Sequence, residues 1–285
     1  MSINLQNVTY VYMSKTPFEK VAIKNINIEI KQGEFVGIIG HTGSGKSTLV
    51  QHLNGLLKPT SGTVTIGEQN IHSKGQAARQ AKSRVGMVFQ YPEHQLFEET
   101  VYEDIAFGPR NLGIPEDEID SRVKKALNFV GLDFEKYAQR TPFQLSGGQM
   151  RRVAIAGVIA LEPEYLILDE PSAGLDPRGR DEIFGQIINL YEATGMTVVL
   201  VSHNMEDVAK MANRLLVMKD GEISLDGTPK DIFQNYQVEL KQAGVDAPPL
   251  TLLMNKFKQR GLDVDNTVIA TDAAADSIFD AVRRC

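Results

Sequence analysis

Residues 40–48 read Gly-His-Thr-Gly-Ser-Gly-Lys-Ser-Thr, directly after the apolar run 35–39 and before a stretch with helical patterning. This segment fits the pattern G-x-x-x-x-G-K-[ST] of a phosphate-binding loop. Its glycines let successive backbone N–H groups face phosphate oxygens, and the N-terminus of the following helix adds partial positive charge. The sequence therefore predicts a nucleoside triphosphate site where a strand meets a helix.

Each polar side chain at the end of this loop has its own expected contact. Lys46 is expected to reach the β- and γ-phosphates, Ser47 to bind Mg²⁺, and Thr48 to contact the α-phosphate. The other loop residues are expected to surround the phosphates: Gly40, His41, Thr42, Gly43, Ser44 and Gly45.

Two carboxylates, Asp169 and Glu170, follow the apolar run 165–168. Alone, such a pair would be read as a solvated strand end, but a phosphate loop in the same chain favours catalysis. We expect Asp169 to hold Mg²⁺ through water. We expect Glu170 to be the base that orients and polarises the attacking water.

A second glycine-containing segment, Leu145-Ser146-Gly147-Gly148-Gln149, lies far beyond the first. No strand pattern precedes it, so it is not another phosphate loop of the first kind. Ser146 is a natural N-cap for a helix that we expect to begin near Met150, and the two glycines expose backbone N–H groups. The segment is therefore a second candidate for phosphate contact.

Hydrophobic patterning predicts an α/β fold. Residues 3–12, 21–30 and 62–67 include alternating apolar and polar stretches, which favours an antiparallel sheet with one solvated face. Continuous apolar runs separated by helical patterns favour parallel strands in an open sheet, at residues 35–39, 85–89, 165–168 and 197–201. Ligands of such sheets bind beyond the carboxyl ends of the strands.

The domain organisation follows from where this patterning changes. Between Gln90 and Pro163, helices are expected at 117–130 and 150–161, which indicates a helical insertion. After Gly227 the chain reads as helices joined by a loop at 244–249. We predict a nucleotide-binding domain over 1–227, with a helical subdomain at about 91–162, and a C-terminal extension over 228–285.

Composition restricts the possible partners. The 285 residues carry a net charge of −6 and no long basic run, which disfavours nucleic acid and anionic lipid as partners. The single cysteine, Cys285, allows no intrachain disulfide, as is usual in a reducing compartment. No apolar run approaches 18 residues, and the start does not read as a signal peptide. We expect a protein that stays inside the cell.

The order of these motifs resembles that of the ATP-binding-cassette (ABC) ATPases over about residues 3–227. Leu-Ser-Gly-Gly-Gln is their signature, and the resemblance implies that residues 145–149 clamp the γ-phosphate of ATP held by the opposite subunit of a head-to-tail dimer. It implies ATP and Mg²⁺ as ligands. It also implies a cassette fold with an N-terminal antiparallel β-subdomain, a helical insertion and a C-terminal helical extension.

The resemblance implies roles for four more residues. Tyr12 is expected to stack on adenine, with Phe18 as a competing candidate, and Gln90 to link Mg²⁺ and water to a transmembrane partner. Asp176, in the loop 172–176, is expected to communicate across the dimer. His203 is expected to contact the γ-phosphate.

A narrower resemblance is to the energy-coupling factor (ECF) transporter ATPases, and within them to the second of their two paralogues. It rests on residues 40–47, 91–97 and 141–180. It implies four expectations: a second, different ABC ATPase as partner; a shared transmembrane coupling subunit; a membrane subunit that captures a vitamin or metal ion; and a place at the cytoplasmic face of the cell membrane. The C-terminal extension would help to hold the ATPase pair together.

Two alternatives remain open at this stage. One is the ATPase of an ordinary importer or of a homodimeric cobalt or nickel ECF importer. The other is a soluble ABC ATPase of DNA repair or translation, although those chains usually carry a long coiled-coil insertion or two cassettes, and neither is found in this sequence.

An acidic segment follows Gln90. A charge run is often only a solvated face, but ECF transmembrane subunits present arginines, which suit an acidic groove. We therefore predict a docking face for the membrane subunit at Glu93, Glu98, Glu99, Glu103 and Asp104.

Overall fold

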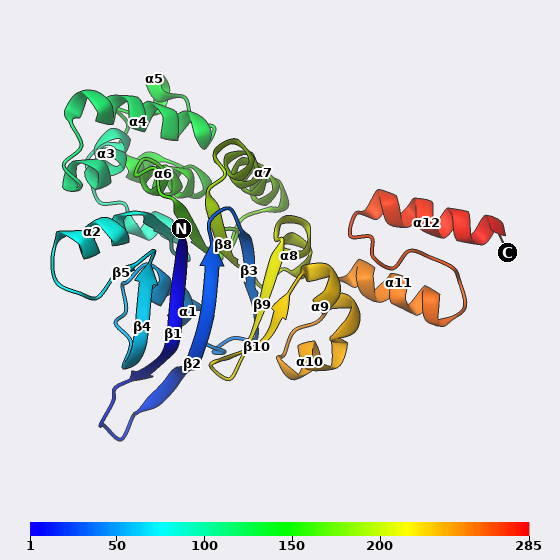
Figure 1. Ribbon diagram of the computed structural model, residues 1–285. Coiled ribbons are helices and arrows are strands. Elements are labelled where there is room, and N and C mark those ends of the chain that lie inside the picture. The colour runs from blue at the N-terminus through cyan, green and yellow to red at the C-terminus, as the bar shows by residue number, and fades with distance from the viewer. Residues whose placement is uncertain (285) are drawn as a thin grey trace.

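The computed structural model of this protein describes residues 1–284, so Cys285 lies outside the described residues. The N-terminal part is an antiparallel sheet with the strand order β2-β1-β4-β5 (Figure 1). Its strands are β1 (Ser2–Tyr12), β2 (Lys20–Lys31), β4 (Ser61–Ile66) and β5 (Gln69–Asn70). Along β2, Ile26, Ile28 and Ile30 are buried while their neighbours are exposed. This is the alternation expected of a sheet with one solvated face.

The second sheet has six strands in the order β10-β9-β3-β8-β7-β6. They are β3 (Phe35–Ile39), β6 (Val85–Val88), β7 (Tyr165–Asp169), β8 (Thr197–Val201), β9 (Arg214–Lys219) and β10 (Glu222–Gly227). Neighbouring strands are parallel except that β10 is antiparallel to β9. Every residue of β3, β6, β7 and β8 is buried, which confirms the reading of continuous apolar runs as parallel strands covered on both faces.

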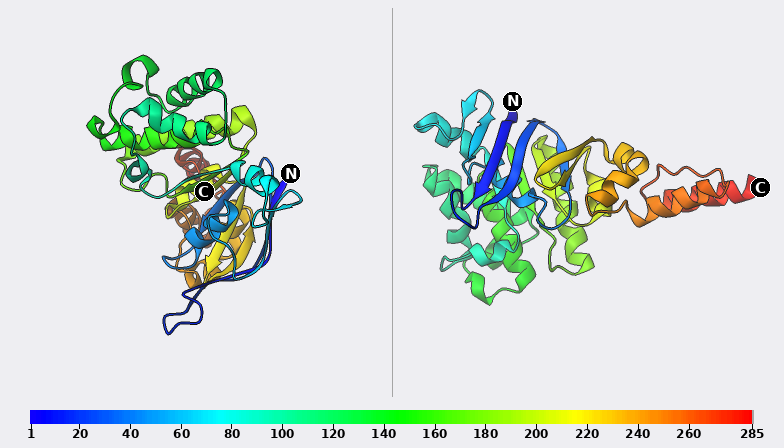
Figure 2. Two further views of the ribbon diagram at one scale, coloured as in Figure 1. Left: turned by 90° about the vertical axis from the view of Figure 1, so that its left-hand side faces the viewer. Right: turned by 90° about the horizontal axis from the view of Figure 1, so that it is seen from below.

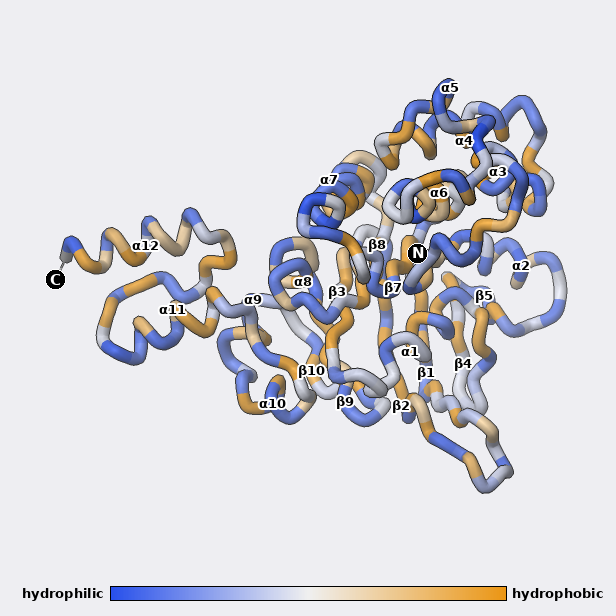
Figure 3. Tube along the Cα trace, turned by 180° about the vertical axis from the view of Figure 1, so that it is seen from behind, coloured by the Kyte–Doolittle hydropathy of each residue, from blue (hydrophilic) through white to orange (hydrophobic). Residues whose placement is uncertain are grey.

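Two apolar clusters cover the two faces of this sheet. On β8, Val198 and Leu200 belong to the cluster with the helices, and Val199 and Val201 to the cluster with the antiparallel sheet and α1 (Lys46–Leu53). The structure is therefore layered, with helices, parallel sheet and antiparallel sheet in that order (Figures 1 and 2). Hydrophobic segments of the chain trace, in orange, lie along buried strands such as β3 and also on helices such as α12 (Thr271–Arg284) (Figure 3).

Helices fill the connection between β6 and β7. They are η1 (Pro92–Gln95), α3 (Val101–Asn111), α4 (Glu116–Phe129), α5 (Phe134–Tyr137), η2 (Pro142–Gln144) and α6 (Gly147–Ile159). Before them, α2 (Gln76–Ser83) follows β5. Ser146 caps α6, as expected, but the expected start near Met150 is wrong, because Gly147, Gly148 and Gln149 form the first turn of the helix. The expectation placed the two glycines outside the helix, whereas a capped first turn accepts them.

The remaining helices follow β7 and β8 or lie at the C-terminal end. They are α7 (Pro177–Thr194), α8 (Met205–Met211), α9 (Pro229–Asn235), α10 (Gln237–Gln242), α11 (Pro249–Gln259) and α12 (Thr271–Arg284). The sequence predicted one loop in this tail, at 244–249, but a second follows α11. α11 and α12 project away from the sheets (Figures 1 and 2) and share a small core of Met254, Val264, Ala274 and Ala281.

Candidate nucleotide-binding site

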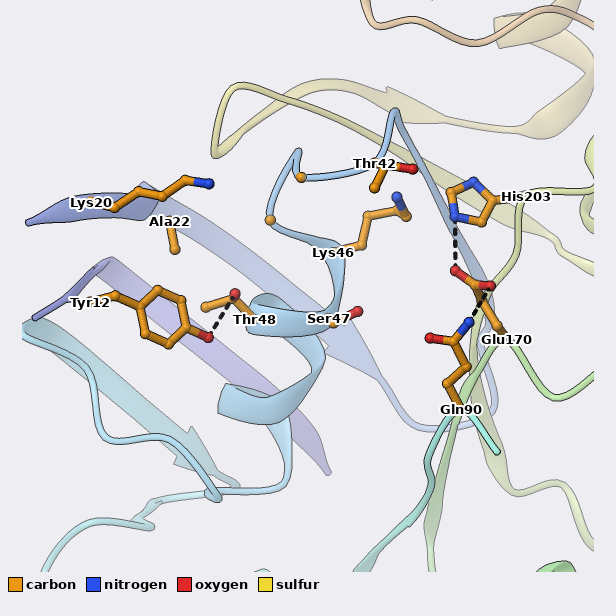
Figure 4. A pocket seen from close by; sticks show the side chains of 12 residues that line it. Tyr12, Lys20, Ala22, Thr42, Lys46, Ser47, Thr48, Gln90, Glu170 and His203 are labelled. Atoms are coloured by element: carbon orange, nitrogen blue, oxygen red, sulfur yellow. Dashed lines mark hydrogen bonds and ion pairs between the residues drawn. The ribbon is translucent and has the colours of Figure 1, made fainter. Parts of the chain in front are cut away.

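Four motifs meet at one edge of the six-stranded sheet. The phosphate loop 40–45 follows β3, Gln90 follows β6, Glu170 follows β7 and His203 follows β8. These strands are parallel, so their carboxyl ends lie at the same edge, and residues far apart in the sequence converge there. Tyr12 reaches the same cavity from the end of β1 (Figure 4).

The phosphate loop needs glycine because other backbone approaches it closely. Gly40 and Gly45 have φ of 152° and 104°. A Cβ would lie 2.3 Å from the Met218 carbonyl oxygen at Gly40, and 2.6 Å from the Ala22 carbonyl oxygen at Gly45. At Gly43, with φ of 84°, the same Cβ would meet open space. The loop is thus confined from behind and open toward the cavity, as a phosphate cradle requires.

Lys46 is buried beneath this loop. Its Nζ donates to the carbonyl oxygens of Gly40 and His41, at 2.8 and 3.0 Å. Burial lowers the pKa of Lys46, while the nearby carboxylates of Glu170 and Asp169 act to raise it. Lys46 is the cation that faces both candidate catalytic carboxylates.

Asp169 is the last residue of β7 and is 5% exposed. Burial raises the pKa of its carboxyl, whereas a hydrogen bond from Ser47 lowers it. Ser47 and Asp169 therefore lie side by side, as the predicted magnesium site requires. Ser47 lines the cavity together with Gln90 and Glu170, whereas Asp169 lies behind Ser47 and is not a lining residue (Figure 4).

The side chain of Glu170 is held at both oxygens. His203 Nε2 lies 2.8 Å from Oε1, and Gln90 Nε2 donates to Oε2 at 3.2 Å (Figure 4). The backbone of Glu170 has φ of 52°, a left-handed value that is uncommon for a residue with a side chain. Its N–H donates to the Val201 carbonyl oxygen at 3.0 Å. The three residues expected to do catalysis are therefore in direct contact.

The cavity between Tyr12 and Glu170 has a volume of about 370 Å³ and is lined by Thr42, Gly43, Gly45, Lys46, Ser47, Thr48, Gln90 and His203. The Tyr12 hydroxyl lies 3.3 Å from Thr48 Oγ1. Phe18 is 77% exposed on the connection between β1 and β2 and is not a lining residue. Lys20 and Ala22 of β2 also line the cavity. They were not predicted from the sequence, because no local motif marks them.

The second predicted segment forms the N-terminus of α6. Ser146 Oγ accepts from the Gln149 N–H at 3.3 Å, and Gln149 Oε1 accepts from the Ser146 N–H at 3.0 Å. This is a capping box. The Gln149 amide also donates to the Tyr137 hydroxyl at 3.1 Å. Gly147 and Gly148 face open space, so their N–H groups have room for a ligand.

A separate cavity of about 640 Å³ lies beside this helix start, and Ser146, Gly148, Gln149 and Asp176 all line it. Asp176 caps α7, where its Oδ1 accepts from the Gly179 N–H at 2.7 Å. No residue lines both this cavity and the cavity that Lys46 lines. The signature segment therefore contributes to a cavity of its own and not to the cavity that Lys46 lines.

The acidic segment after Gln90 is less uniform than its sequence suggests. Asp104 Oδ1 accepts from the N–H groups of Phe97 and Glu98, at 3.1 and 3.3 Å. Burial raises the pKa of Asp104, and these hydrogen bonds act against it. Glu103 is ion-paired with Arg110. Within residues 1–284, no ion pair is found at Glu98 or Glu99. Glu93 has no ion pair among these residues either, but its Oε2 is buried, so Glu98 and Glu99 are the carboxylates of this segment that are available to a partner.

No helix within residues 1–284 combines the length and apolar character needed to cross a membrane. The same residues contain no group of three or more His, Cys, Asp or Glu side chains arranged to hold a metal ion. Mg²⁺ at nucleotide sites is bound by one or two protein oxygens together with phosphates and water, so Ser47 and Asp169 fit that ion.

The chain was compared with protein families and with known proteins. Residues 23–173 match the family model described as ABC transporter. The chain is 56% identical to the energy-coupling factor transporter ATP-binding protein EcfA2 of Clostridium tetani, over 98% of this chain and 96% of that protein. It is 53% identical to EcfA2 of Clostridium perfringens, over 99% of both.

Solved structures agree with these relatives. CbiO1 of Clostridium perfringens, part of the ABC transporter complex cbiONQ, superposes with a TM-score of 0.72 at 37% identity, over 91% of this chain and 95% of that one. The ATP-binding cassette MJ0796, a dimer in a post-hydrolysis state with ADP and Pi, superposes with a TM-score of 0.70 at 32% identity, over 80% and 98%. The chain therefore belongs to the ABC transporter family, among the ATP-binding subunits of energy-coupling factor transporters.

Proposed function

We propose that the cavity of Tyr12, Lys46 and Glu170 binds ATP with Mg²⁺ and hydrolyses it once a partner ATPase closes over it. The arrangement of Glu170 is the main support. A carboxylate held by His203 and Gln90, close to a buried lysine on a phosphate loop, can orient a water molecule for attack on a γ-phosphate.

The chain's own residues account for binding and positioning. Tyr12 stacks on adenine at the open end, and the N–H groups of residues 43–48 surround the phosphates. Lys46 exchanges its two carbonyl contacts for phosphate oxygens, which offsets the cost of its burial. Glu170 accepts a hydrogen bond from the attacking water, and His203 contacts the γ-phosphate. Positioning and charge stabilisation supply most of the catalysis in phosphoryl transfer.

Mg²⁺ fits the oxygens of Ser47 and Asp169, with Gln90 at the same side of the cavity. When bound, the ion neutralises charge that develops on the phosphate oxygens. Asp169 is already hydrogen-bonded to Ser47, and its burial makes an unpaired negative charge costly there, so a cation is favoured beside it.

The signature segment serves a second chain. Ser146, Gly148, Gln149 and Asp176 line a cavity that is separate from the one lined by Lys46, which supports contact between this helix start and nucleotide brought by another subunit. We propose a head-to-tail pair with a second ABC ATPase, of a different paralogue, in which ATP bridges the two. Nucleotide then shifts the population toward the closed pair.

We further propose the setting of an ECF uptake transporter at the cytoplasmic face of the cell membrane. A transmembrane coupling subunit docks beside Gln90, where Glu98 and Glu99 are available to its basic side chains. A substrate-capture subunit takes up a vitamin or another micronutrient. Residues 228–285 help to hold the two ATPases together. The names of the EcfA2 relatives and of the cbiONQ complex support the setting of an ECF transporter.

The hydrolytic role is tested with Glu170→Gln in the assembled transporter. The variant keeps the shape of the side chain but loses the base, so we expect turnover at this site to fall by about 10²-fold or more while ATP still binds. Steady-state hydrolysis and equilibrium binding of ATP measure the two effects. The exposed Glu192→Gln on α7 is the control and should hydrolyse normally. Normal turnover in Glu170→Gln would show that the base is another residue.

The transport role is tested by purification from detergent extracts of membranes. Recovery of a different ATPase with two membrane proteins supports the proposal. Recovery of a homodimer of this chain indicates a cobalt or nickel type of importer, and recovery without any membrane protein indicates a soluble ABC ATPase.

A further inference from the structure

Arg151 lies in the second turn of α6 and is 2% exposed. Arginine is seldom buried so completely, because its charge is costly to remove from water. Burial lowers the pKa of its guanidinium, and the negative charge of Glu93 acts against that effect. No sequence motif described above gives this residue a role, so its burial needs an explanation.

The guanidinium of Arg151 is directed at the loop that carries Glu170. Its Nη1 donates to the Ala173 carbonyl oxygen, and its Nη2 donates to the Glu170 carbonyl oxygen at 3.2 Å. The Glu170 carbonyl also accepts from the Ala173 N–H at 3.1 Å. Arg151 therefore spans a tight turn of the backbone and binds it at both ends. Its Nε has no hydrogen-bond partner among the described residues, so these two carbonyls are the acceptors of its head group, and Glu93 is the anion that acts on its charge.

This turn fixes the direction of the Glu170 side chain. Glu170 has the left-handed φ of 52°, a conformation that a residue with a Cβ keeps only when its surroundings impose it. Its N–H is held by Val201, and its C=O is held by Arg151. With both peptide groups fixed, the carboxylate is directed to His203 and Gln90.

We infer that Arg151 is a positioning residue for the hydrolysis of ATP, which acts by holding the Glu170 backbone in the conformation that places its carboxylate. This inference rests on the proposed function, because it takes Glu170 as the base. The helix that carries Arg151 begins with the signature segment. The residue that positions Glu170 is thus carried by the same helix that we propose faces the nucleotide of the partner.

The neighbouring Arg152 shows that this contact is specific to Arg151. Arg152 is only partly buried and is ion-paired with Glu182 of α7. Its guanidinium is directed to that helix and away from the Glu170 turn, although it is the next residue along α6. The two arginines point to different elements because successive helix residues are about 100° apart around the axis.

The test uses the assembled transporter with Arg151→Met, which has a chain of similar length but no donor. We expect kcat to fall by about tenfold or more, because small misplacements of a catalytic group are costly, while KM and ATP affinity change by less than about threefold. Arg151→Lys keeps a buried cation and one donor group. It should fold and recover part of the rate.

Arg122→Met is the matched control. Arg122 also bonds a carbonyl oxygen, that of Ala160 at 3.3 Å, and pairs with Glu118 and Glu162, but none of these partners is in the Glu170 turn, and Arg122 lines a cavity that Glu170 does not. Arg122→Met should lower the midpoint of thermal unfolding and leave kcat unchanged. Equal kcat values for Arg151→Met and wild type, or parallel losses of kcat and ATP affinity, would overturn the inference.

A double substitution separates this inference from the proposed function. If Arg151 acts through Glu170, Arg151→Met should not lower the hydrolysis that remains in Glu170→Gln. A further tenfold loss in that background would show a general structural role. Normal turnover in Glu170→Gln alone would instead refute the base assignment. Should Arg151→Met fail to fold, Arg151→Lys decides, because full wild-type kcat in that variant contradicts a requirement for two bonded carbonyls.

Discussion

The backbone N–H of His41, inside the phosphate loop, donates to the carbonyl oxygen of Ala243, just after α10, at 3.1 Å. The phosphate loop is therefore bonded to the C-terminal helices as well as to its own strand and helix. Gly244 follows with φ of 68°, and a Cβ there would lie 2.9 Å from the His41 Cβ. The C-terminal extension thus contacts the candidate nucleotide site directly. A substitution in the extension should therefore alter ATP binding.

The first prediction concerns Gly244→Ala. The added methyl group meets His41 and the left-handed φ is strained, so we expect a loss of about 1 kcal/mol in stability and about fivefold weaker ATP binding. Gly261→Ala is the matched control, since Gly261 has φ of 90° but open space around it. It should lose stability alone. Calorimetry of ATP binding and thermal unfolding measure both effects, and equal ATP affinity in the two variants would argue against the coupling.

The second prediction concerns adenine. Base–aromatic stacking is worth about 1–3 kcal/mol, so Tyr12→Ala should weaken ATP binding by about tenfold or more. Tyr12→Phe keeps the ring and loses only the contact with Thr48, so it should bind nearly as wild type. Phe18→Ala should have no effect, since Phe18 does not line the cavity. A larger effect at Phe18 than at Tyr12 in equilibrium binding would reverse the assignment.

The third prediction concerns Ser146→Arg. The substitution removes the helix cap, at a cost of about 1 kcal/mol, and puts a long side chain where the partner's nucleotide is expected. Hydrolysis at the partner's site should fall, whereas ATP binding by this chain alone should be unchanged, because its own cavity lies elsewhere. Ser146→Ala is the control for the lost cap. Weaker ATP binding by the isolated chain would contradict the separation of the two sites.

The fourth prediction concerns pH. The pKa of His72 is lowered from 6.5 to about 4 by burial, then by the charges of Lys82, His52 and Lys58. A depressed pKa in the folded state means that protonation favours unfolding. The folded state therefore keeps its full stability above about pH 6.5, where His72 is neutral in both states, and loses stability as the pH falls from 6.5 toward 4.

His72→Gln should therefore flatten the fall of the unfolding midpoint between pH 6.5 and 4. The fall should not disappear, because burial also lowers the pKa of His52. The exposed His94→Gln controls for the loss of a histidine and should keep the wild-type slope. Identical slopes in thermal melts of wild type and His72→Gln would exclude this source of acid sensitivity.

Sequence patterns predicted the structure where the information was local. The buried strands were predicted from runs such as 197–201, because a strand covered on both faces needs apolar residues throughout. The start of α6 was predicted three residues late, although Ser146 was read as its N-cap, because glycines disfavour a helix; the reciprocal bond from Gln149 is seen only in the structure. Asp104 was read as part of a docking face, but it holds the loop at Phe97 and Glu98, and its role as an acceptor for backbone N–H groups has no pattern in the sequence.

By itself, the sequence determined the family, the phosphate loop and the order of the candidate catalytic side chains, since each depends on residue types in short motifs. Only the tertiary structure decided which distant groups hold them in place. Arg151 reaches Glu170 from α6, the last helix of the insertion, and Ala243 reaches His41 from the end of α10. No local pattern marks such contacts, because each joins a residue at the end of a parallel strand to a helical segment that only the folded chain brings beside it.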